Sequence, residues 1–179
     1  MEEGFFLDSA RLKFRPWTND DIDLARGLWG DCQVTQFLGG PFGENQIAER
    51  LRTEMTHQEQ YGLQYWPVFL KDGPEFIGCC GLRPCSGDES GVRELGYHLC
   101  PPYWRSGYGS EAAECVIGYA FKTLKVKKLF AGHHPQNANS KKILLRLGFQ
   151  YIGDRYYPPT GLHHPCYELT RNQFENERN

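Results

Sequence analysis

The segment PPYWRSGYGSEAAECVIGYAF, residues 101–121, places two glycines, Gly107 and Gly109, at the start of a helix-like run. The N-terminus of a helix carries free backbone N–H groups and a partial positive charge, so it can bind a phosphate. Glycine has no side chain to keep the phosphate away from the backbone. The segment therefore predicts a phosphate-binding cradle in front of this helix. Its expected members, with a charged contact from the first of them at the rim, are Arg105, Ser106, Gly107, Tyr108, Gly109 and Ser110.

The same spacing also fits a plain loop before a helix, and it does not match two familiar nucleotide-binding motifs. The dinucleotide fingerprint G-x-G-x-x-G needs a third glycine where Ala112 stands, and a P-loop needs Gly-Lys-Ser/Thr after the glycines. A phosphate site of another kind and a plain loop are therefore the two interpretations of this segment.

Length and composition predict one globular domain spanning residues 1–179. Apolar residues make up 40% and charged residues 23% of the chain, as in ordinary soluble domains. No apolar run approaches the roughly 20 residues that a membrane helix needs, and the acidic start MEEG lacks the basic region of a signal peptide. With a net charge of -2, we expect a cytoplasmic protein without a nucleic-acid or membrane partner.

The cysteines and histidines predict neither a disulfide framework nor a metal site. The seven cysteines are an odd number without C-x-x-C spacing, which is typical of free thiols in a reducing compartment. Cys79 and Cys80 are adjacent, so in a strand they point to opposite faces. The pairs His133-His134 and His163-His164 lack metal-ligand spacing with Cys or Glu.

Hydrophobic periodicity and turn signals predict a mixed α+β architecture with one central sheet. Asp72-Gly73 is a strong hairpin signal between two apolar runs, and Ser86–Gly91 is a second expected turn, so the middle of the chain is predicted as an antiparallel meander. After residue 100 the pattern alternates between strand and helix. Strands are expected at residues 12–17, 63–71, 75–83, 92–100, 128–134, 149–157 and 166–169, and helices at 18–31, 44–62, 108–123 and 137–148.

Two loops are candidates for the wall of a ligand-binding site. One is FLGGPFG, residues 37–43, and the other is the tail segment YYPPTGLHHPCYEL, residues 156–169. In the tail, His163 and His164 are expected to be ordinary loop residues held by Pro165, with contact to a substrate as the alternative.

Four motifs together resemble the GNAT superfamily, the Gcn5-related N-acetyltransferases, and most closely its ribosomal-protein N-terminal acetyltransferases. WRSGYGSEA is similar to the subgroup's coenzyme motif W-G-K-G-Y-A-T-E-A, although Arg105 replaces a glycine and Trp104 departs from the wider family's Gln or Arg. The other three are RLKFRPWTNDD, RELGYHLCPPYW and NANSKKILLRLGF, in the family's order.

The resemblance implies the GNAT-like acyl-CoA N-acyltransferase fold, with helices on both faces of a mixed twisted sheet and acetyl-CoA as cosubstrate. Two neighbouring parallel strands, LGYHLC and LFAGHH, should splay apart and receive the pantetheine arm. That arm is expected to pair with the backbone near His98, Leu99 and Cys100, and Asn137 is expected to contact it while capping the late helix.

For the chemistry, the resemblance implies direct attack of an amine on the thioester. Glu94 is the candidate general base, and a surface charge paired with Arg93 or Arg83 is the alternative. The family often places a Tyr acid where this chain has Leu144, so Ser140, water or an unprotonated leaving thiolate must serve instead. Tyr97 and His98 are expected to be structural.

The motifs do not define the acceptor or the number of subunits. A small-molecule amine and a peptide N-terminus both fit, as do a monomer and a homodimer. Two other functions compete with acetyl transfer: a non-catalytic acyl-CoA sensor on the same fold, and a nucleotide-binding protein of a different fold.

Overall fold

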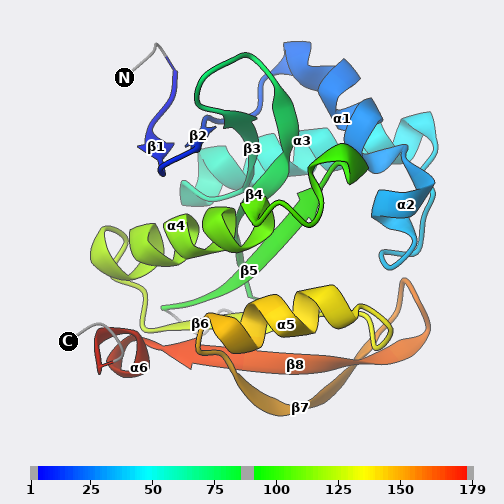
Figure 1. Cartoon of the computed structure of the whole chain (residues 1–179). Coiled ribbons are helices and arrows are strands. Elements are labelled where there is room, and N and C mark those ends of the chain that lie inside the picture. The colour runs from blue at the N-terminus through cyan, green and yellow to red at the C-terminus, as the bar shows by residue number, and fades with distance from the viewer. Residues whose placement is uncertain (1–3, 86–90, 177–179) are drawn as a thin grey trace.

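The computed structural model describes residues 4–85 and 91–176, which form one eight-stranded sheet in the order β1-β2-β3-β4-β5-β6-β8-β7 (Figure 1). Neighbouring strands are antiparallel except β5 and β6, which are parallel. The mixed α+β class is therefore confirmed. The strands are β1 Leu7–Asp8, β2 Leu12–Phe14, β3 Tyr65–Leu70, β4 Phe76–Pro84, β5 Val92–Leu99, β6 Lys128–Gly132, β7 Gln150–Tyr157 and β8 Leu162–Thr170.

Helices cover both faces of this sheet, as the resemblance predicted. Short 3-10 turns at Asn19–Asp21 and Pro101–Tyr103 precede α1 and α4. The α-helices are α1 Ile22–Trp29, α2 Cys32–Thr35, α3 Glu44–Tyr61, α4 Tyr108–Lys122, α5 Ala138–Arg146 and α6 Arg171–Asn176.

Each face of the sheet has its own hydrophobic core. Ala112 and Val116 of α4 and Leu144 of α5 pack with Trp66 and Cys80 in one core. On the other face, side chains of α1 and α3 pack against the sheet, and the members of this second core include Trp29, Ile47, Leu51, Tyr65 and Cys79. The adjacent cysteines of β4 thus point to opposite faces, as predicted, and both are buried because both faces are covered.

The parallel strands β5 and β6 separate soon after they begin. Their pairing joins Val92, Arg93 and Glu94 to Lys128, Leu129 and Phe130. From Leu95 onward β5 stays paired with β4 alone among the described strands, while β6 stays paired with β8. The predicted splay is confirmed, and it opens the sheet on the C-terminal side of Glu94.

The tail corrects the sequence-based expectation. Residues 158–161 form the turn of a hairpin between β7 and β8, so His163 and His164 lie in a strand, where they pair with Tyr156 and Arg155. Pro165 suggested a loop because proline removes a ladder hydrogen bond. It is accommodated here because pairing of β8 with β6 ends one residue later, at Cys166.

Other short elements also escaped the sequence patterns. The predicted strand at 12–17 is only Leu12–Phe14, and β1, α2 and α6 were not expected. The Asp72-Gly73 hairpin is confirmed by the pairing of β3 with β4. Most of the expected turn at Ser86–Gly91 lies outside the described residues.

Candidate active site

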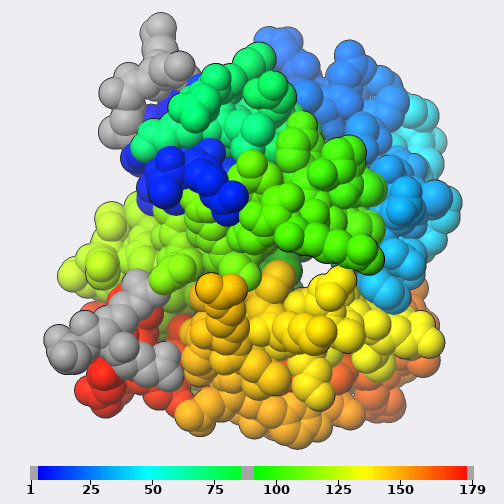
Figure 2. Space-filling view, viewed as in Figure 1, coloured from blue at the N-terminus to red at the C-terminus, as the bar shows by residue number. Residues whose placement is uncertain are grey.

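A cleft of about 720 Å³ opens where β5 and β6 part. Figure 2 shows this face hollowed between the green residues that precede α4 and the yellow residues of α5. Nine of the twelve predicted site residues line the cleft: Glu94, His98, Leu99, Arg105, Gly107, Gly109, Ser110, Asn137 and Ser140. Cys100, Ser106 and Tyr108 do not. The splayed strands thus bring the predicted residues of three separate segments to one cavity.

The two glycines of the cradle have different structural roles. Gly107 precedes α4 with φ +82°, a conformation that favours glycine. Gly109 lies inside the helix, and a Cβ there would come within 3.4 Å of Ile143 Cδ1 and 3.5 Å of Leu99 Cδ1. Gly107 therefore shapes the loop, while Gly109 lets α4 approach β5 and α5 closely.

The first turn of α4 presents unused backbone donors to the cleft. The N–H of Glu111 donates to the carbonyl of Gly107 at 3.1 Å. Among the described residues, none accepts a hydrogen bond from the N–H groups of residues 107–110. These amides carry the partial positive charge of the helix N-terminus, which suits an anion.

Arg11 holds this loop from outside, and sequence reasoning missed it. Its guanidinium donates to the carbonyl of Ser106 at 3.2 Å, pairs with Glu111 at 2.7 Å and lies over the Tyr108 ring at 4.3 Å. Ser106 and Tyr108 are thereby engaged by Arg11 outside the cleft. The early RLKF motif is the sequence signal that contained this residue.

The backbone of β5 offers the gap a different set of groups from those expected. The N–H of Cys100 donates to the Ile77 carbonyl of the neighbouring chain segment at 2.9 Å. Backbone groups alternate between the two edges of a strand, so the groups of His98 also face β4, whereas those of Tyr97 and Leu99 face the gap. The Leu99 carbonyl accepts from Trp104 Nε1 at 2.7 Å. The donors available to a ligand in the gap are therefore the N–H groups of Tyr97 and Leu99.

Glu94 is the last residue of β5 that pairs with β6, and it lies beside a buried cluster formed by Glu54, Tyr65 and Arg83. Its Oε1 accepts a hydrogen bond from the Tyr65 hydroxyl at 3.4 Å. Arg83 stands opposite on β4 but pairs with Glu54 instead, and Arg93 donates to the Val92 carbonyl. Glu94 is thus free of the ion pairs that its alternative interpretation required.

Burial raises the pKa of Glu94 above its ordinary value, although Arg83 and the Tyr65 hydrogen bond act in the opposite direction. Burial also raises the pKa of Tyr65 well above its usual range, so Tyr65 stays protonated and donates. A carboxylate with a raised pKa is a better base, and this one faces the cleft.

His98 lies beside Glu94's cluster as a neutral imidazole. Burial and the nearby guanidinium groups of Arg50 and Arg83 hold the pKa of His98 well below its usual range. Its Nδ1 accepts from Trp29 Nε1 at 3.4 Å and contacts Cys79 Sγ at 3.6 Å. Because the Trp29 indole can only donate, Nδ1 is the acceptor and the ring proton is assigned to Nε2.

The N-terminus of α5 forms the opposite wall. Asn137 caps the helix by accepting from the Ser140 N–H at 3.1 Å, as predicted. The Ser140 hydroxyl lies 2.9 Å from the Tyr97 hydroxyl, and burial raises the pKa of Tyr97 well above its ordinary value. Leu144 is buried in the core. The described site therefore holds a serine–tyrosine hydroxyl pair near the position of the missing tyrosine acid.

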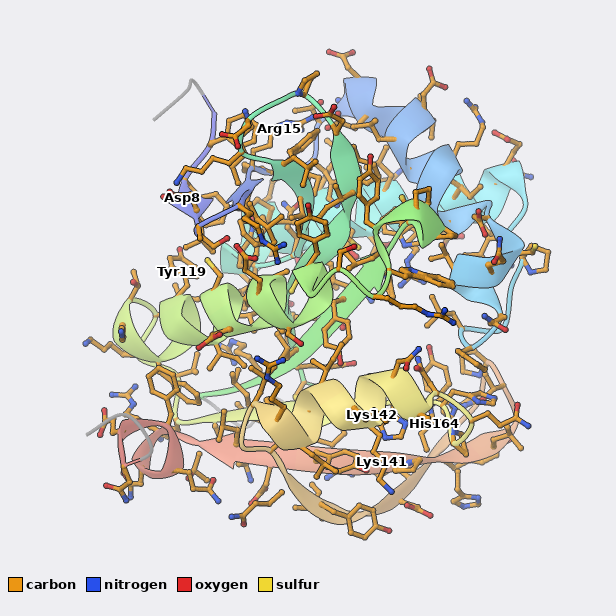
Figure 3. The ribbon with its side chains drawn as sticks, viewed as in Figure 1. Asp8, Arg15, Tyr119, Lys141, Lys142 and His164 are labelled. Carbon is orange, nitrogen blue, oxygen red and sulfur yellow. The ribbon has the colours of Figure 1, made fainter. Side chains whose placement is uncertain are left out.

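The β7–β8 hairpin supplies an aromatic end to the cleft. The His164 ring lies tilted against that of Tyr157, with the centroids 4.6 Å apart. It also forms a hydrogen bond with Thr160 Oγ1 at 2.8 Å and meets His134 edge-on. Figure 3 marks His164 on β8 and Lys142 on α5, both of which line the cleft. His163 is not among the lining residues.

Over residues 4–85 and 91–176, no group of three His, Cys, Asp or Glu side chains is placed so that it could hold a metal ion. Within those same ranges no helix combines the length and the apolar character needed to cross a membrane. The seven cysteines all lie within the described ranges, and no disulfide joins any two of them.

Sequence comparison gives the family. The family model of the acetyltransferase (GNAT) domain matches residues 11–150. An uncharacterized N-acetyltransferase p20 of Bacillus licheniformis is 30% identical over 149 residues, which cover 82% of this chain and 83% of the relative. The chain belongs to the GNAT acetyltransferases. Acetyl-CoA is the acetyl donor of this family. The Bacillus licheniformis relative is named as an N-acetyltransferase.

Solved structures share the fold across distant sequences. A ribosomal L7/L12 alpha-N-protein acetyltransferase, RimL, has a TM-score of 0.77 at 13% identity, covering 93% of each chain. Aminoglycoside acetyltransferase AAC(6')-Ib in complex with coenzyme A has a TM-score of 0.77 at 20% identity, covering 94% of this chain and 99% of that one. Since these two act on such different acceptors by name, the fold alone does not define the acceptor.

Proposed function

We propose that this protein acetylates a primary amine by direct attack on acetyl-CoA, with Glu94 as the general base. The observation that carries the proposal is the position of Glu94, a carboxylate with a raised pKa and no ion-pair partner among the described residues. It lines the same cleft as the unused amides of the α4 N-terminus. A base and an anion-binding cradle in one cavity are what this reaction requires.

The cradle and the open edge of β5 suit the coenzyme. The amides of Gly107 to Ser110 can bind the pyrophosphate, and the N–H groups of Tyr97 and Leu99 can pair with the amide-rich pantetheine arm as an added strand would. One of these strand amides is also in position to donate to the oxyanion that develops on the thioester carbonyl. We do not include Cys100 among the residues that bind the pantetheine arm, because its N–H already donates to the Ile77 carbonyl.

Glu94 removes the proton that the attacking amine must lose. An ammonium cannot attack a carbonyl, and a carboxylate in the cleft, or one water away from the amine, can accept its proton. The hydrogen bond from Tyr65 orients the Glu94 carboxylate. Arg83, held by Glu54, keeps the cluster from accumulating unbalanced negative charge.

Ser140 and Tyr97 form the pair that can assist the leaving thiolate. Their hydroxyls are 2.9 Å apart, so one hydroxyl can orient the other toward the gap. A thiol in water has a pKa of about 8.5, so the leaving group needs little help. We assign this pair a modest role that is mainly one of positioning.

A thiol-release assay with a panel of primary amines tests the proposal. We expect release of free coenzyme A that depends on an amine, with the N-acetylated amine as the second product. Tight binding of acetyl-CoA without amine-dependent release would instead favour an acyl-CoA sensor. Binding of ATP in preference to acetyl-CoA would overturn the assignment of the cradle.

A further inference from the structure

Arg50 of α3 is a cation in the cleft that the proposed reaction leaves unused. It lines the cleft together with Tyr65, Arg83 and Glu94. Its Nε is buried, and no described residue accepts a hydrogen bond from it. No carboxylate of the described residues lies within ion-pair distance of the Arg50 guanidinium, whereas Arg83 beside it is paired with Glu54. This Nε–H group is a buried donor without an acceptor, which is costly, so Arg50 requires an explanation.

Contacts with aromatic rings satisfy only the flat face of the Arg50 guanidinium. The group lies over the ring of Trp29 at 5.0 Å and near that of Phe42 at 5.5 Å. Such stacking uses the flat face of the guanidinium. The N–H donors lie in its plane and point along its edge. Stacking therefore leaves those of the two terminal nitrogens for a planar oxyanion, while the Nε–H stays buried in the protein.

Glu54 and Glu94 are the two described carboxylates near Arg50 and Arg83, but neither forms an ion pair with Arg50. Both oxygens of Glu54 are engaged, one by Arg83 and the other by the Tyr65 N–H at 2.8 Å. Among the described lining residues Glu94 is the one acidic side chain. The basic residues that line the cleft are Arg50, Arg83, Arg105, Lys142 and Arg155.

The missing anion does not belong to the coenzyme cradle. Arg50 stacks on Trp29, which packs with Tyr65 and Cys79 in the core between the sheet and helices α1 and α3. The cradle precedes α4, whose Ala112 packs in the core on the opposite face. The helix that carries the cradle thus packs on the face of the sheet opposite to the core on which Arg50 stacks.

We propose that Arg50 binds an oxyanion of the acceptor, so that the acceptor is a small amine that also carries a carboxylate or a phosphate ester. This inference rests on the proposed function and names its substrate class. Arg50 and Glu94 line the same cleft, so one small molecule can present its oxyanion to the guanidinium and its amine to the carboxylate. Polyamines and aminoglycoside-like polycations are disfavoured, because most charged groups in the cleft are themselves cations.

Matched pairs of acceptors test the inference on the full-length protein. One arm compares α-amino acids with their carboxamides, which keep the shape and remove the negative charge. A second arm compares O-phosphoethanolamine with ethanolamine, so the two arms distinguish a carboxylate from a phosphate ester. The readouts are kcat/KM from thiol release, and calorimetric binding of the same compounds to the protein saturated with coenzyme A.

In one of the two arms we expect the anionic member to be preferred by about 30-fold or more, as for other buried charge pairs. Arg50→Met should abolish that preference by raising KM for the anionic acceptor relative to the neutral one. Arg50→Lys keeps the charge without the fork and should retain part of the preference. Arg52→Met, on the exposed side of α3, is the matched control and should behave as wild type.

Equal use of anionic and neutral amines by the wild-type protein would overturn the inference and leave the proposed acetyl transfer intact. If no amine is acetylated, the proposed function fails, and the calorimetric arm decides the inference. Arg50-dependent binding of the anionic compounds would then support it. Equal affinity for the two members of every pair, or binding unaffected by Arg50→Met, would contradict it.

Discussion

The two sides of the cleft offer a ligand different chemical groups: backbone N–H groups on one side and ionisable side chains on the other. On the side that we propose for the coenzyme, the coenzyme side, the α4 N-terminus and the edge of β5 offer backbone N–H groups, and Gly107 keeps the approach open. On the side that we propose for the acceptor, the acceptor side, the cleft meets a cluster of buried ionisable side chains between the sheet and helices α1 and α3. This acceptor-side cluster consists of Arg50, Glu54, Tyr65, Arg83 and Glu94.

This difference separates a site that depends on the course of the backbone from one that depends on particular side chains. Backbone donors depend on the course of the chain and on one or two glycines, so many sequences can supply them. Buried charges depend on side chains from α3, β3, β4 and β5, each of which needs its own partner. We therefore expect substitutions on the acceptor side to change stability and acceptor choice, and substitutions on the coenzyme side to change coenzyme affinity.

The largest expected effect is the loss of Glu54. Glu54→Gln removes the partner of Arg83 and leaves a buried cation uncompensated, which costs about 3–5 kcal/mol of unfolding free energy. Urea unfolding followed by circular dichroism measures this. Glu59→Gln, on an exposed position of the same helix, is the control and should change little. Equal stability of the two variants would mean that the acceptor-side cluster does not hold the fold.

Glu94→Gln should separate chemistry from binding. We expect turnover to fall by roughly 10² or more if Glu94 accepts the amine proton, with acetyl-CoA affinity unchanged. The deficit should shrink at high pH, where free amine is abundant. A variant that turns over at the wild-type rate at pH 7 would reduce Glu94 to a structural residue.

The pH dependence of kcat/KM is an independent test of Glu94 as the general base. Because burial raises the pKa of Glu94, the base is protonated, and the rate is lost, as pH falls through a value above the ordinary 4.5 of a glutamate. The acid limb of kcat/KM should therefore lie above that value in the wild type. Glu94→Gln should lack this limb, and its persistence in the variant would assign it to another group.

On the coenzyme side, Gly107→Val should weaken acetyl-CoA binding at least tenfold, which corresponds to about 1.4 kcal/mol. Valine is strained at the left-handed φ of this position and crowds the amides of the cradle. Gly118→Ala lies in the same helix with open space at its Cβ position, so it should leave affinity unchanged. Calorimetric titration compares them, and unchanged affinity in a folded Gly107→Val protein would remove the phosphate from this loop.

The smallest expected effect is at the hydroxyl pair. Ser140→Ala and Tyr97→Phe should each slow single-turnover acetyl transfer less than tenfold, because a thiolate leaves readily. Coenzyme affinity should stay within error of wild type. A loss of several hundredfold in Ser140→Ala would make Ser140 the proton donor. Leu144→Tyr is a poor rescue, since Leu144 is buried and a larger side chain overpacks the core.

The sequence signals for the proposed coenzyme side are local, and nine of the twelve residues that they predicted line one cleft. The glycines, the strand before them and the Asn137 cap follow one another within a short stretch of chain, and each has a physical reason to occur at a strand–helix junction. The sequence-based prediction did not consider that backbone N–H groups alternate between the two edges of β5. This alternation turns the Cys100 N–H toward Ile77 and the Leu99 N–H toward the gap.

The acceptor side was largely beyond prediction because its members are distant in the chain. Glu54 lies on the apolar side of a helix, where its carboxylate is satisfied by Arg83 and Tyr65 from two other strands. Nothing in the sequence around Arg50 indicates that Trp29 covers its face. The β7–β8 hairpin was missed for a similar reason: Pro165 argues against a strand until the neighbouring strand is known to end beside it.

A crystal structure of the protein with coenzyme A bound tests the division of the cleft most directly. The account predicts the pyrophosphate within hydrogen-bond distance of the amides of residues 107–110, the pantetheine arm against the N–H groups of Tyr97 and Leu99, and an Arg50 guanidinium without contact to the coenzyme. A pyrophosphate bound against Arg50 and Arg83 on the acceptor side would contradict it.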